Sequence, residues 1–188
     1  MNVYDFDKTI YCKDSSFDFF FFCLGKDITL LRHAPRMIYG WSKYLAGKIS
    51  KTQGKEYIFS FLCSVKDIDA KVNEFWEKKF GGIYPWYLAQ KKEDDVIISA
   101  SPEFLLSPVC ARLGVRLICS KVDRHSGKFD GENCYGKEKV VRFCAIFGET
   151  EIDEFYSDSY SDAPLARLAK KAYLVSGAGV REWESDKM

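Results

Sequence analysis

Residues 1–9 read MNVYDFDKT, and this stretch decides the fold. Residues 1–6 are mostly apolar and reach the acidic Asp5, after which polar turn residues 7–9 follow. The pattern predicts a short buried strand, from Met1 to Phe6, with carboxylates at its end. Because side chains alternate along a strand, Asp5 and Asp7 meet only if the chain bends there, and the turn residues supply such a bend.

The second half of the chain alternates between strand and helix patterns. The continuous β-branched run at residues 96–98 is typical of a strand that is buried on both faces. Further strands are predicted at 115–122, 154–157 and 172–176, and helices at 102–113, 137–147 and 163–170. Residues 127–131 resemble a hairpin turn with Lys128, Phe129 and Asp130 exposed. Such alternation predicts βαβ units, and hence an α/β fold with a Rossmann-like parallel sheet sandwiched by helices.

A helical block follows the first strand, from about residue 14 to residue 90. Ser15 or Ser16 could cap its first helix, and residues 28–45 carry helical apolar spacing that Pro35 interrupts. Residues 55–61 and 70–80 continue the helical pattern. Aromatic residues are frequent here, and we interpret them as packing between helices rather than as a substrate cage.

Three polar segments lie where parallel strands end, at residues 5–9, 99–101 and 158–162. The carboxyl ends of such strands form the usual ligand crevice of an open α/β sheet. Phosphoryl transfer to a carboxylate needs a nucleophile, a Lewis acid, groups that hold the phosphate oxygens, and a proton donor. The sequence offers a candidate for each of them.

Four motifs in order resemble those of the haloacid dehalogenase superfamily: DFDKT at 5–9, IISAS at 97–101, GKEKV at 136–140 and SDSYSD at 157–162. The likeness is greatest to the branch of phosphoserine phosphatases, in which a helical cap is inserted between the first two motifs. It implies a catalytic core formed by residues 1–13 and 89–188, with a helical cap at 14–88.

The resemblance also implies a role for each motif residue. Asp5 would attack phosphorus to form an aspartyl-phosphate, and Asp7 would protonate the leaving group and then activate water. Ser99 would hold a phosphoryl oxygen. The third-motif lysine would offset negative charge, and we favour Lys139 over Lys137 because Lys139 directly precedes the apolar positions of the helix.

The implied cofactor is Mg2+. Asp158 would coordinate it together with the Asp5 carboxylate and the main-chain carbonyl of Asp7, and Asp162 would support the metal or its waters. Ligands that are all oxygen atoms suit this ion, which prefers octahedral geometry and retains several waters.

Two departures from phosphoserine phosphatases concern the substrate. Lys8 replaces the glycine or serine that often follows the second aspartate, and Ala100-Ser101 replace two glycines. Both departures weaken phosphoserine as the substrate, and the expected activity is Mg2+-dependent hydrolysis of a small phosphomonoester. The alternatives are a phosphotransferase, a phosphatase of lipid head groups such as phosphatidylglycerophosphate, and, as the least favoured, a noncatalytic binding module.

Composition excludes several partners. The net charge of +1 provides no overall field for nucleic acid, which we do not expect as a partner. Seven scattered cysteines without a C-x-x-C pair indicate reduced thiols, and the start of the chain lacks a secretory leader, so a cytoplasmic location is expected. No run is long enough to span a bilayer. Basic residues among apolar ones at 32–51 could touch anionic lipid, but a helix packed on its neighbours is favoured. No feature indicates an oligomeric state.

Overall fold

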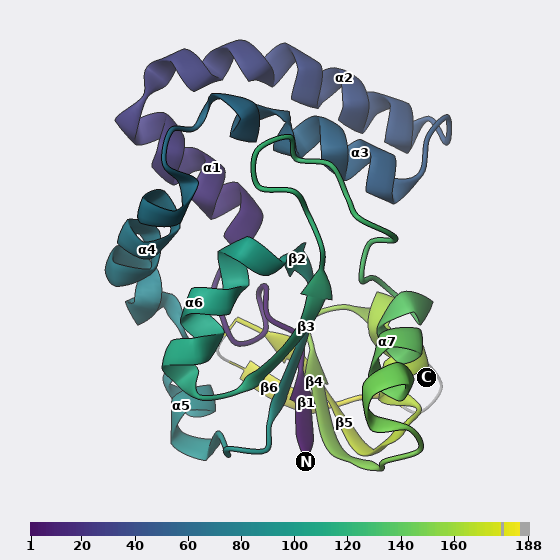
Figure 1. Cartoon of the computed structure of the whole chain (residues 1–188). Coiled ribbons are helices and arrows are strands. Elements are labelled where there is room, and N and C mark those ends of the chain that lie inside the picture. The colour runs from purple at the N-terminus through teal and green to yellow at the C-terminus, as the bar shows by residue number, and fades with distance from the viewer. Residues whose placement is uncertain (178, 185–188) are drawn as a thin grey trace.

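The computed structural model describes residues 1–177 and 179–184. A six-stranded sheet lies at its centre, in the order β3-β2-β1-β4-β5-β6 (Figure 1). The first five strands are parallel, as predicted, and β6 pairs with β5 in the antiparallel direction. The strands are β1 (Asn2–Tyr4), β2 (Val96–Pro102), β3 (Arg116–Ser120), β4 (Ile152–Ser157), β5 (Ala169–Ser176) and β6 (Gly179–Glu182).

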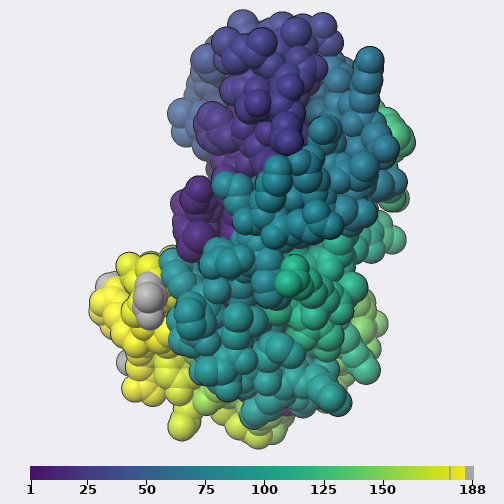
Figure 2. Space-filling model, turned by 90° about the vertical axis from the view of Figure 1, so that its left-hand side faces the viewer, coloured from purple at the N-terminus to yellow at the C-terminus, as the bar shows by residue number. Residues whose placement is uncertain are grey.

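Helices cover both faces of this sheet, which confirms the predicted α/β sandwich (Figure 1). The α-helices are α1 (Ser15–Lys26), α2 (Ala34–Leu45), α3 (Lys51–Ile58), α4 (Ile68–Lys79), α5 (Pro85–Gln90), α6 (Glu103–Leu113), α7 (Lys137–Phe147) and α8 (Ala163–Ala166). The 3-10 helices are η1 (Ile28–His33), η2 (Phe59–Ser64), η3 (Phe80–Gly82) and η4 (Tyr160–Asp162). In Figure 2 the purple and blue residues of the early helices form the upper part of the molecule, and the green and yellow residues of the sheet region lie below.

Alternation along the strands divides the interior into two hydrophobic cores. Tyr4 and Tyr156 belong to the core on the side of α4 and α6, and their rings stack with centroids 4.7 Å apart. Val3 and Phe155, one residue earlier in each strand, belong to the other core, with α7 and α8. Because successive strand side chains point to opposite faces, the parallel register of β1 with β4 sets which side chain enters which core.

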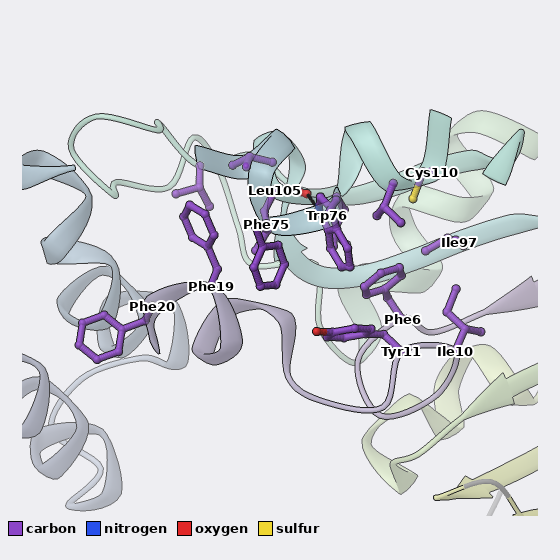
Figure 3. Packing of buried hydrophobic residues seen from close by; sticks show 14 of the residues in the cluster. Phe6, Ile10, Tyr11, Phe19, Phe20, Phe75, Trp76, Ile97, Leu105 and Cys110 are labelled. Atoms are coloured by element: carbon purple, nitrogen blue, oxygen red, sulfur yellow. Dashed lines mark hydrogen bonds between the residues drawn. The ribbon is translucent and has the colours of Figure 1, made fainter. Parts of the chain in front are cut away.

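A run of aromatic rings connects the sheet with the helices that precede β2 (Figure 3). Phe6 and Tyr11 lie in the segment after β1, and the ring of each packs edge-on against Trp76. The Trp76 indole donates a hydrogen bond of 2.6 Å to the Leu105 carbonyl, so its polar atom is satisfied inside the core. Phe75 is fully buried beside it. The ring of Trp76 therefore serves packing, as the sequence predicted.

Helices α2 and α3 pack closely because each has a glycine opposite a tyrosine of the other. A Cβ at Gly40 would lie 2.1 Å from the Cβ of Tyr57, a distance that atoms cannot adopt. In the reverse direction, a Cβ at Gly54 would lie 3.1 Å from the Cβ of Tyr44. The absence of a side chain at residue 40 therefore permits this approach of the two helices.

One predicted helix start is corrected. Asp14, and not Ser15 or Ser16, caps α1, because its carboxylate accepts a hydrogen bond of 3.0 Å from the Phe17 amide. The predicted interruption at Pro35 is confirmed: η1 ends at His33, and Pro35 lies in the first turn of α2, where its missing N–H has no helical partner to lose.

The segment after β3 also differs from the prediction. Its turn lies at residues 124–126, before the predicted 127–131, and Val122 pairs with Phe129. Phe129 is half-buried, not exposed, because its ring packs against Phe59 of η2. Lys128 pairs with Glu56 of α3 at 2.9 Å. This segment therefore reaches across the molecule to the early helices (Figure 1).

Near the end of the chain, helix α8 is shorter than predicted, strand β5 is longer, and there is an additional strand. Helix α8 ends at Ala166, and Lys170 lies in β5 instead of in the helix. The predicted helix is too long because its end depends on pairing between β5 and β4, which begins at Ala169. The antiparallel β6 was not predicted. Within residues 1–177 and 179–184, no helix has the length and apolarity that crossing a membrane requires.

Candidate active site

The predicted motifs meet at the carboxyl end of the sheet. The chain passes from β1 to β2 and β3 on one side, and then returns to place β4 on the other side of β1. A crevice forms where strand order reverses in this way, and it is the usual ligand site of such sheets. A pocket of about 260 Å³ lies there, lined by residues of all four motifs, among them Asp5, Ser99, Lys139 and Asp158.

Asp5 occupies the position directly after β1. Its amide donates a hydrogen bond of 2.8 Å to the carbonyl of Tyr156, which extends the pairing with β4 and fixes the backbone. The residue is 7% exposed, and its Oδ1 accepts a hydrogen bond of 2.6 Å from the Lys139 ammonium. Burial is the largest influence and raises the pKa of Asp5, while the charge of Lys139 opposes it.

Lys139 bridges two carboxylates from the first turn of α7. Its Nζ lies 2.6 Å from Asp5 and 2.7 Å from Asp162 Oδ2, and the side chain is buried. Burial opposes the charged form, but the carboxylates of Asp162 and Asp5 outweigh it and raise the pKa of Lys139. Lys137 is exposed, so the structure brings Lys139, and not Lys137, to Asp5.

The turn after β1 brings the second carboxylate to the same pocket. The Phe6 carbonyl accepts three backbone amides, and Lys8 adopts a left-handed conformation with φ of 56°. Asp7 Oδ1 accepts a hydrogen bond of 2.8 Å from the Ser15 amide, and Oδ2 accepts one of 2.5 Å from the Ser101 hydroxyl. Burial and the nearby charge of Asp14 raise the pKa of Asp7 to about 6.

The remaining motif residues lie around these two carboxylates. Ser99 is buried in β2, and its hydroxyl accepts a hydrogen bond of 3.1 Å from the Ser101 amide. The Asp158 amide donates to the Thr9 hydroxyl at 3.0 Å, and burial raises the pKa of the Asp158 carboxyl. The sequence thus identified residues that fold into one pocket from four separate segments.

The oxygen atoms at the site are of the kind that bind a divalent cation such as Mg2+. No three His, Cys, Asp or Glu side chains of residues 1–177 and 179–184 form a metal-binding group by themselves. Mg2+ is usually bound by one or two carboxylates together with waters and substrate phosphate, so a larger cluster is not required. Asp162 Oδ1 is buried without a hydrogen-bond partner, and Asp5, Asp158 and Asp162 line the same pocket. An unpaired carboxylate oxygen of this kind fits a site for a cation or its water.

Sequence reasoning missed two serines that hold Asp7. Ser101 donates to the Asp7 carboxylate, and the Ser15 and Ser101 hydroxyls lie 3.1 Å apart. Ser101 belongs to the second motif, but the sequence identified it only as a replacement for a glycine of phosphoserine phosphatases and indicated no role for it. Its position two residues after Ser99 on the same strand was the available signal.

Lys55 of α3 is a further residue that the sequence did not indicate. Its Nζ donates to the Ala100 carbonyl at 2.7 Å and to Asn133 Oδ1 at 3.3 Å, and it lines the pocket. Burial lowers the pKa of Lys55 to about 8, against the attraction of Asp14 and Asp7. Nothing local in the sequence separates it from the other lysines of this segment.

Solved structures share this fold. A protein of unknown function from Bordetella pertussis Tohama I is 21% identical, with a TM-score of 0.71 over 92% of this chain and 87% of that one. A phosphoserine phosphohydrolase-like protein from Francisella tularensis is 18% identical, with a TM-score of 0.57 over 92% of this chain and 86% of the other. The solved structures of this fold thus include phosphoserine phosphatase-like hydrolases, as the resemblance implied.

Sequence comparison extends the likeness beyond the fold. Protein CicA of Caulobacter vibrioides is 28% identical over 190 aligned residues, which cover 92% of this chain and 85% of that protein. The family model described as haloacid dehalogenase-like hydrolase matches residues 3–167, a range that begins before Asp5 and ends beyond Asp162. Since this match takes in most of the chain and every motif at the pocket, the protein belongs to the haloacid dehalogenase-like hydrolase family.

Proposed function

We propose that this hydrolase removes phosphate from a small phosphomonoester through an aspartyl-phosphate intermediate. The observation that carries the proposal is the buried ion pair of Asp5 with Lys139, which shares its pocket with the carboxyl group of Asp7. A nucleophilic carboxylate, a cation beside it and a second acid are the groups that such a reaction needs. The phosphohydrolase-like name of the Francisella relative supports the same substrate class.

The proposed reaction has two steps. Asp5 attacks phosphorus, the ester P–O bond breaks, and Asp7 gives its proton to the leaving oxygen. A water then attacks phosphorus while Asp7 takes its proton, the bond between phosphorus and Asp5 breaks, and phosphate leaves. Ser99 holds a phosphoryl oxygen, and Lys139 offsets the negative charge where Asp5 and the phosphate meet.

We propose Mg2+ as the cofactor, which supplies a Lewis acid for the phosphate oxygens when it is bound. Asp5, the main-chain carbonyl of Asp7, and Asp158 would hold it. Asp162 would support the metal or its waters. The orphaned Asp162 Oδ1 favours this role, because its other oxygen already accepts from Lys139 and Ser157.

The test is phosphate release from a panel of phosphomonoesters with Mg2+, with and without EDTA. Asp5→Asn serves as the blank, and Asp130→Asn, an exposed change outside the pocket, serves as the matched control. We expect turnover by the wild type and by Asp130→Asn only.

Absence of turnover of every compound by a folded wild-type protein would contradict the proposal. Mg2+ binding without any turnover would instead indicate a binding module. Transfer of the phosphoryl group from Asp5 to an added alcohol faster than to water would indicate a phosphotransferase.

Two further predictions accompany this function. The division into a core of residues 1–13 and 89–188 and a cap of residues 14–88 stays a prediction, which limited proteolysis at the two junctions tests. The cytoplasmic location also stays a prediction, and fractionation of cells of the source organism tests it.

A further inference from the structure

A second cavity adjoins the active-site pocket. We call it the apolar groove; it measures about 450 Å³ and lies between α1 and α2. All of its lining residues except Ser42 are apolar. They are Phe17, Phe20, Phe21, Ala34, Met37, Ile38, Trp41, Ser42, Leu45 and Ile58.

The apolar groove and the active-site pocket share a wall. Phe17, Trp41 and Ile58 line both cavities, so the groove begins where the pocket around Asp5 ends. Phe17 and Trp41 are 41% and 37% exposed, and they stand at this junction with their rings accessible. A molecule bound at Asp5 can therefore extend along α1 and α2 without leaving the protein surface.

The groove exposes more large apolar surface than a helix normally leaves to water. Phe21, Ile38 and Leu45 are 61%, 69% and 71% exposed. Scattered apolar side chains on a surface need no explanation, but a contiguous apolar patch marks a binding site. Phe20 and Met37 form its buried floor. From Met37 to Leu45 the stripe extends about 12 Å along α2, at a rise of about 1.5 Å per residue.

Charge changes sharply between the two cavities. The pocket is lined by carboxylates and by lysines, Lys51 and Lys55 among them, whereas no side chain that lines the groove is ionisable. The phosphate end of the ligand follows from the proposed function, and the groove suits an uncharged apolar end.

We propose that the substrate is an amphipathic phosphomonoester whose phosphate binds at Asp5 and whose aliphatic chain lies in the apolar groove. This inference rests on the proposed function and adds the substrate class to it. The aliphatic chain is recognised through burial of its apolar surface, because the side chains that line the groove are apolar apart from the Ser42 hydroxyl and the indole N–H of Trp41.

The test measures kcat/KM for ethyl, butyl, hexyl and octyl phosphate below their micelle concentrations. We expect a rise of up to about fourfold for each methylene that enters the groove, equivalent to about 0.8 kcal/mol per buried methylene. An additional arm presents a long-chain alkyl phosphate in phosphatidylcholine vesicles. Chain-dependent turnover in solution assigns the groove to a free amphiphile, and chain-dependent turnover only in vesicles assigns it to a membrane lipid. Either result supports an aliphatic chain as the occupant.

Ile38→Ser and Leu45→Ser locate the effect. Both should flatten the dependence on chain length, whereas Ile146→Ser should keep the wild-type dependence, since Ile146 is similarly exposed (60%) but lies on α7. For each variant we compare kcat/KM for octyl phosphate with kcat/KM for ethyl phosphate. A lower fraction of folded protein reduces both values equally and leaves their ratio unchanged.

The outcomes separate the two proposals. If no alkyl phosphate is hydrolysed, the broader phosphomonoester panel separates the two failures: turnover of another compound there keeps the function and overturns the amphipathic substrate, and no turnover there means that the proposed function fails. If phosphate is released equally from short and long chains, the function stands and the amphipathic substrate is overturned. Chain dependence that survives Ile38→Ser and Leu45→Ser overturns the groove as its cause. A dimer that Ile38→Asp dissociates, without chain dependence in the wild type, shows that a second copy covers the groove and also overturns the inference.

Discussion

The ammonium of Lys139 lies 2.6 Å from Asp5 and 2.7 Å from Asp162, and all three side chains are buried. Lys139→Met leaves two buried carboxylates without their cation. Breaking a buried ion pair by removing one partner costs about 3–5 kcal/mol, so we expect that loss in the free energy of unfolding together with loss of turnover. Urea unfolding measures the first effect, and phosphate release measures the second.

Lys137→Met is the matched control, because Lys137 lies in the same first turn of α7 but is exposed. It should change the free energy of unfolding by less than about 0.5 kcal/mol. Equal destabilisation by both variants would contradict the structural assignment of Lys139.

The hydroxyl of Ser101 should matter for catalysis because it holds the carboxyl group that we propose as the proton donor. Its hydrogen bond to Asp7 is 2.5 Å long, and a hydrogen bond to a charged group contributes about 1.5–3 kcal/mol. We expect Ser101→Ala to lower kcat about ten- to a hundredfold. Ser107→Ala, which removes a hydroxyl bonded to the Glu103 carbonyl of its own helix, should leave kcat unchanged.

Two glycines should respond to alanine with opposite signs. Gly40→Ala places a methyl group 2.1 Å from the Cβ of Tyr57 and should destabilise the protein by about 1–3 kcal/mol. Gly25→Ala in α1 meets no atom within 4 Å and should stabilise it by about 0.5–1 kcal/mol through helix propensity. Thermal unfolding distinguishes them, and a rise in Tm for both would refute the close packing of α2 on α3.

Lys55 should give the protein a pH-dependent stability. Its pKa is lowered to about 8 in the folded state, whereas a lysine in an unfolded chain titrates near about 10.4. Between these values the unfolded chain binds more protons, so this residue makes the free energy of unfolding rise with pH. Between pH 8 and pH 10, the free energy of unfolding of the wild type should therefore rise relative to that of Lys55→Met. A constant difference over that range would show that the pKa is not lowered.

Mg2+ should stabilise the folded protein even without substrate. A ligand present at about 100 times its Kd adds about 2.7 kcal/mol to the free energy of unfolding. We expect a rise in Tm on adding Mg2+, its reversal by EDTA, and its loss in Asp158→Asn but not in the exposed control Asp130→Asn. An undiminished rise in Asp158→Asn would place the ion elsewhere.

The fold was predictable where local pattern and long-range packing agree. The run at 96–98 and the turn after Asp5 encode a strand and a strand end by composition alone. The helix at 137–147 was predicted with the bounds that α7 has, because Gly148 follows it directly. The end of α8 and the strand β6 depend on pairing with β5, which no local pattern contains.

The candidate site was predictable in its acidic and basic set and not in its supporting groups. Asp5, Asp7 and Asp158 lie at strand ends or in the turns that follow them, where sequence order implies proximity. Lys55 is held in the pocket by residues far away in the sequence. These are Ala100 of β2, 45 positions further along the chain, and Asn133 in the segment after β3. The helical pattern already favoured Lys139 over Lys137, and the structure places Lys139 at Asp5.

The run of aromatic rings from Phe6 to Trp76 has a consequence for protein engineering. Residues 14–88 cannot be exchanged between relatives without changes elsewhere. Trp76 donates a hydrogen bond to the Leu105 carbonyl and packs on the rings of Phe6 and Tyr11 in the turn after β1, and all three lie outside this segment. A chimera that replaces only this segment will combine side chains from two proteins in one hydrophobic core, and these side chains will not pack together. A working exchange has to carry Phe6 and Tyr11 with it, because their rings pack on Trp76.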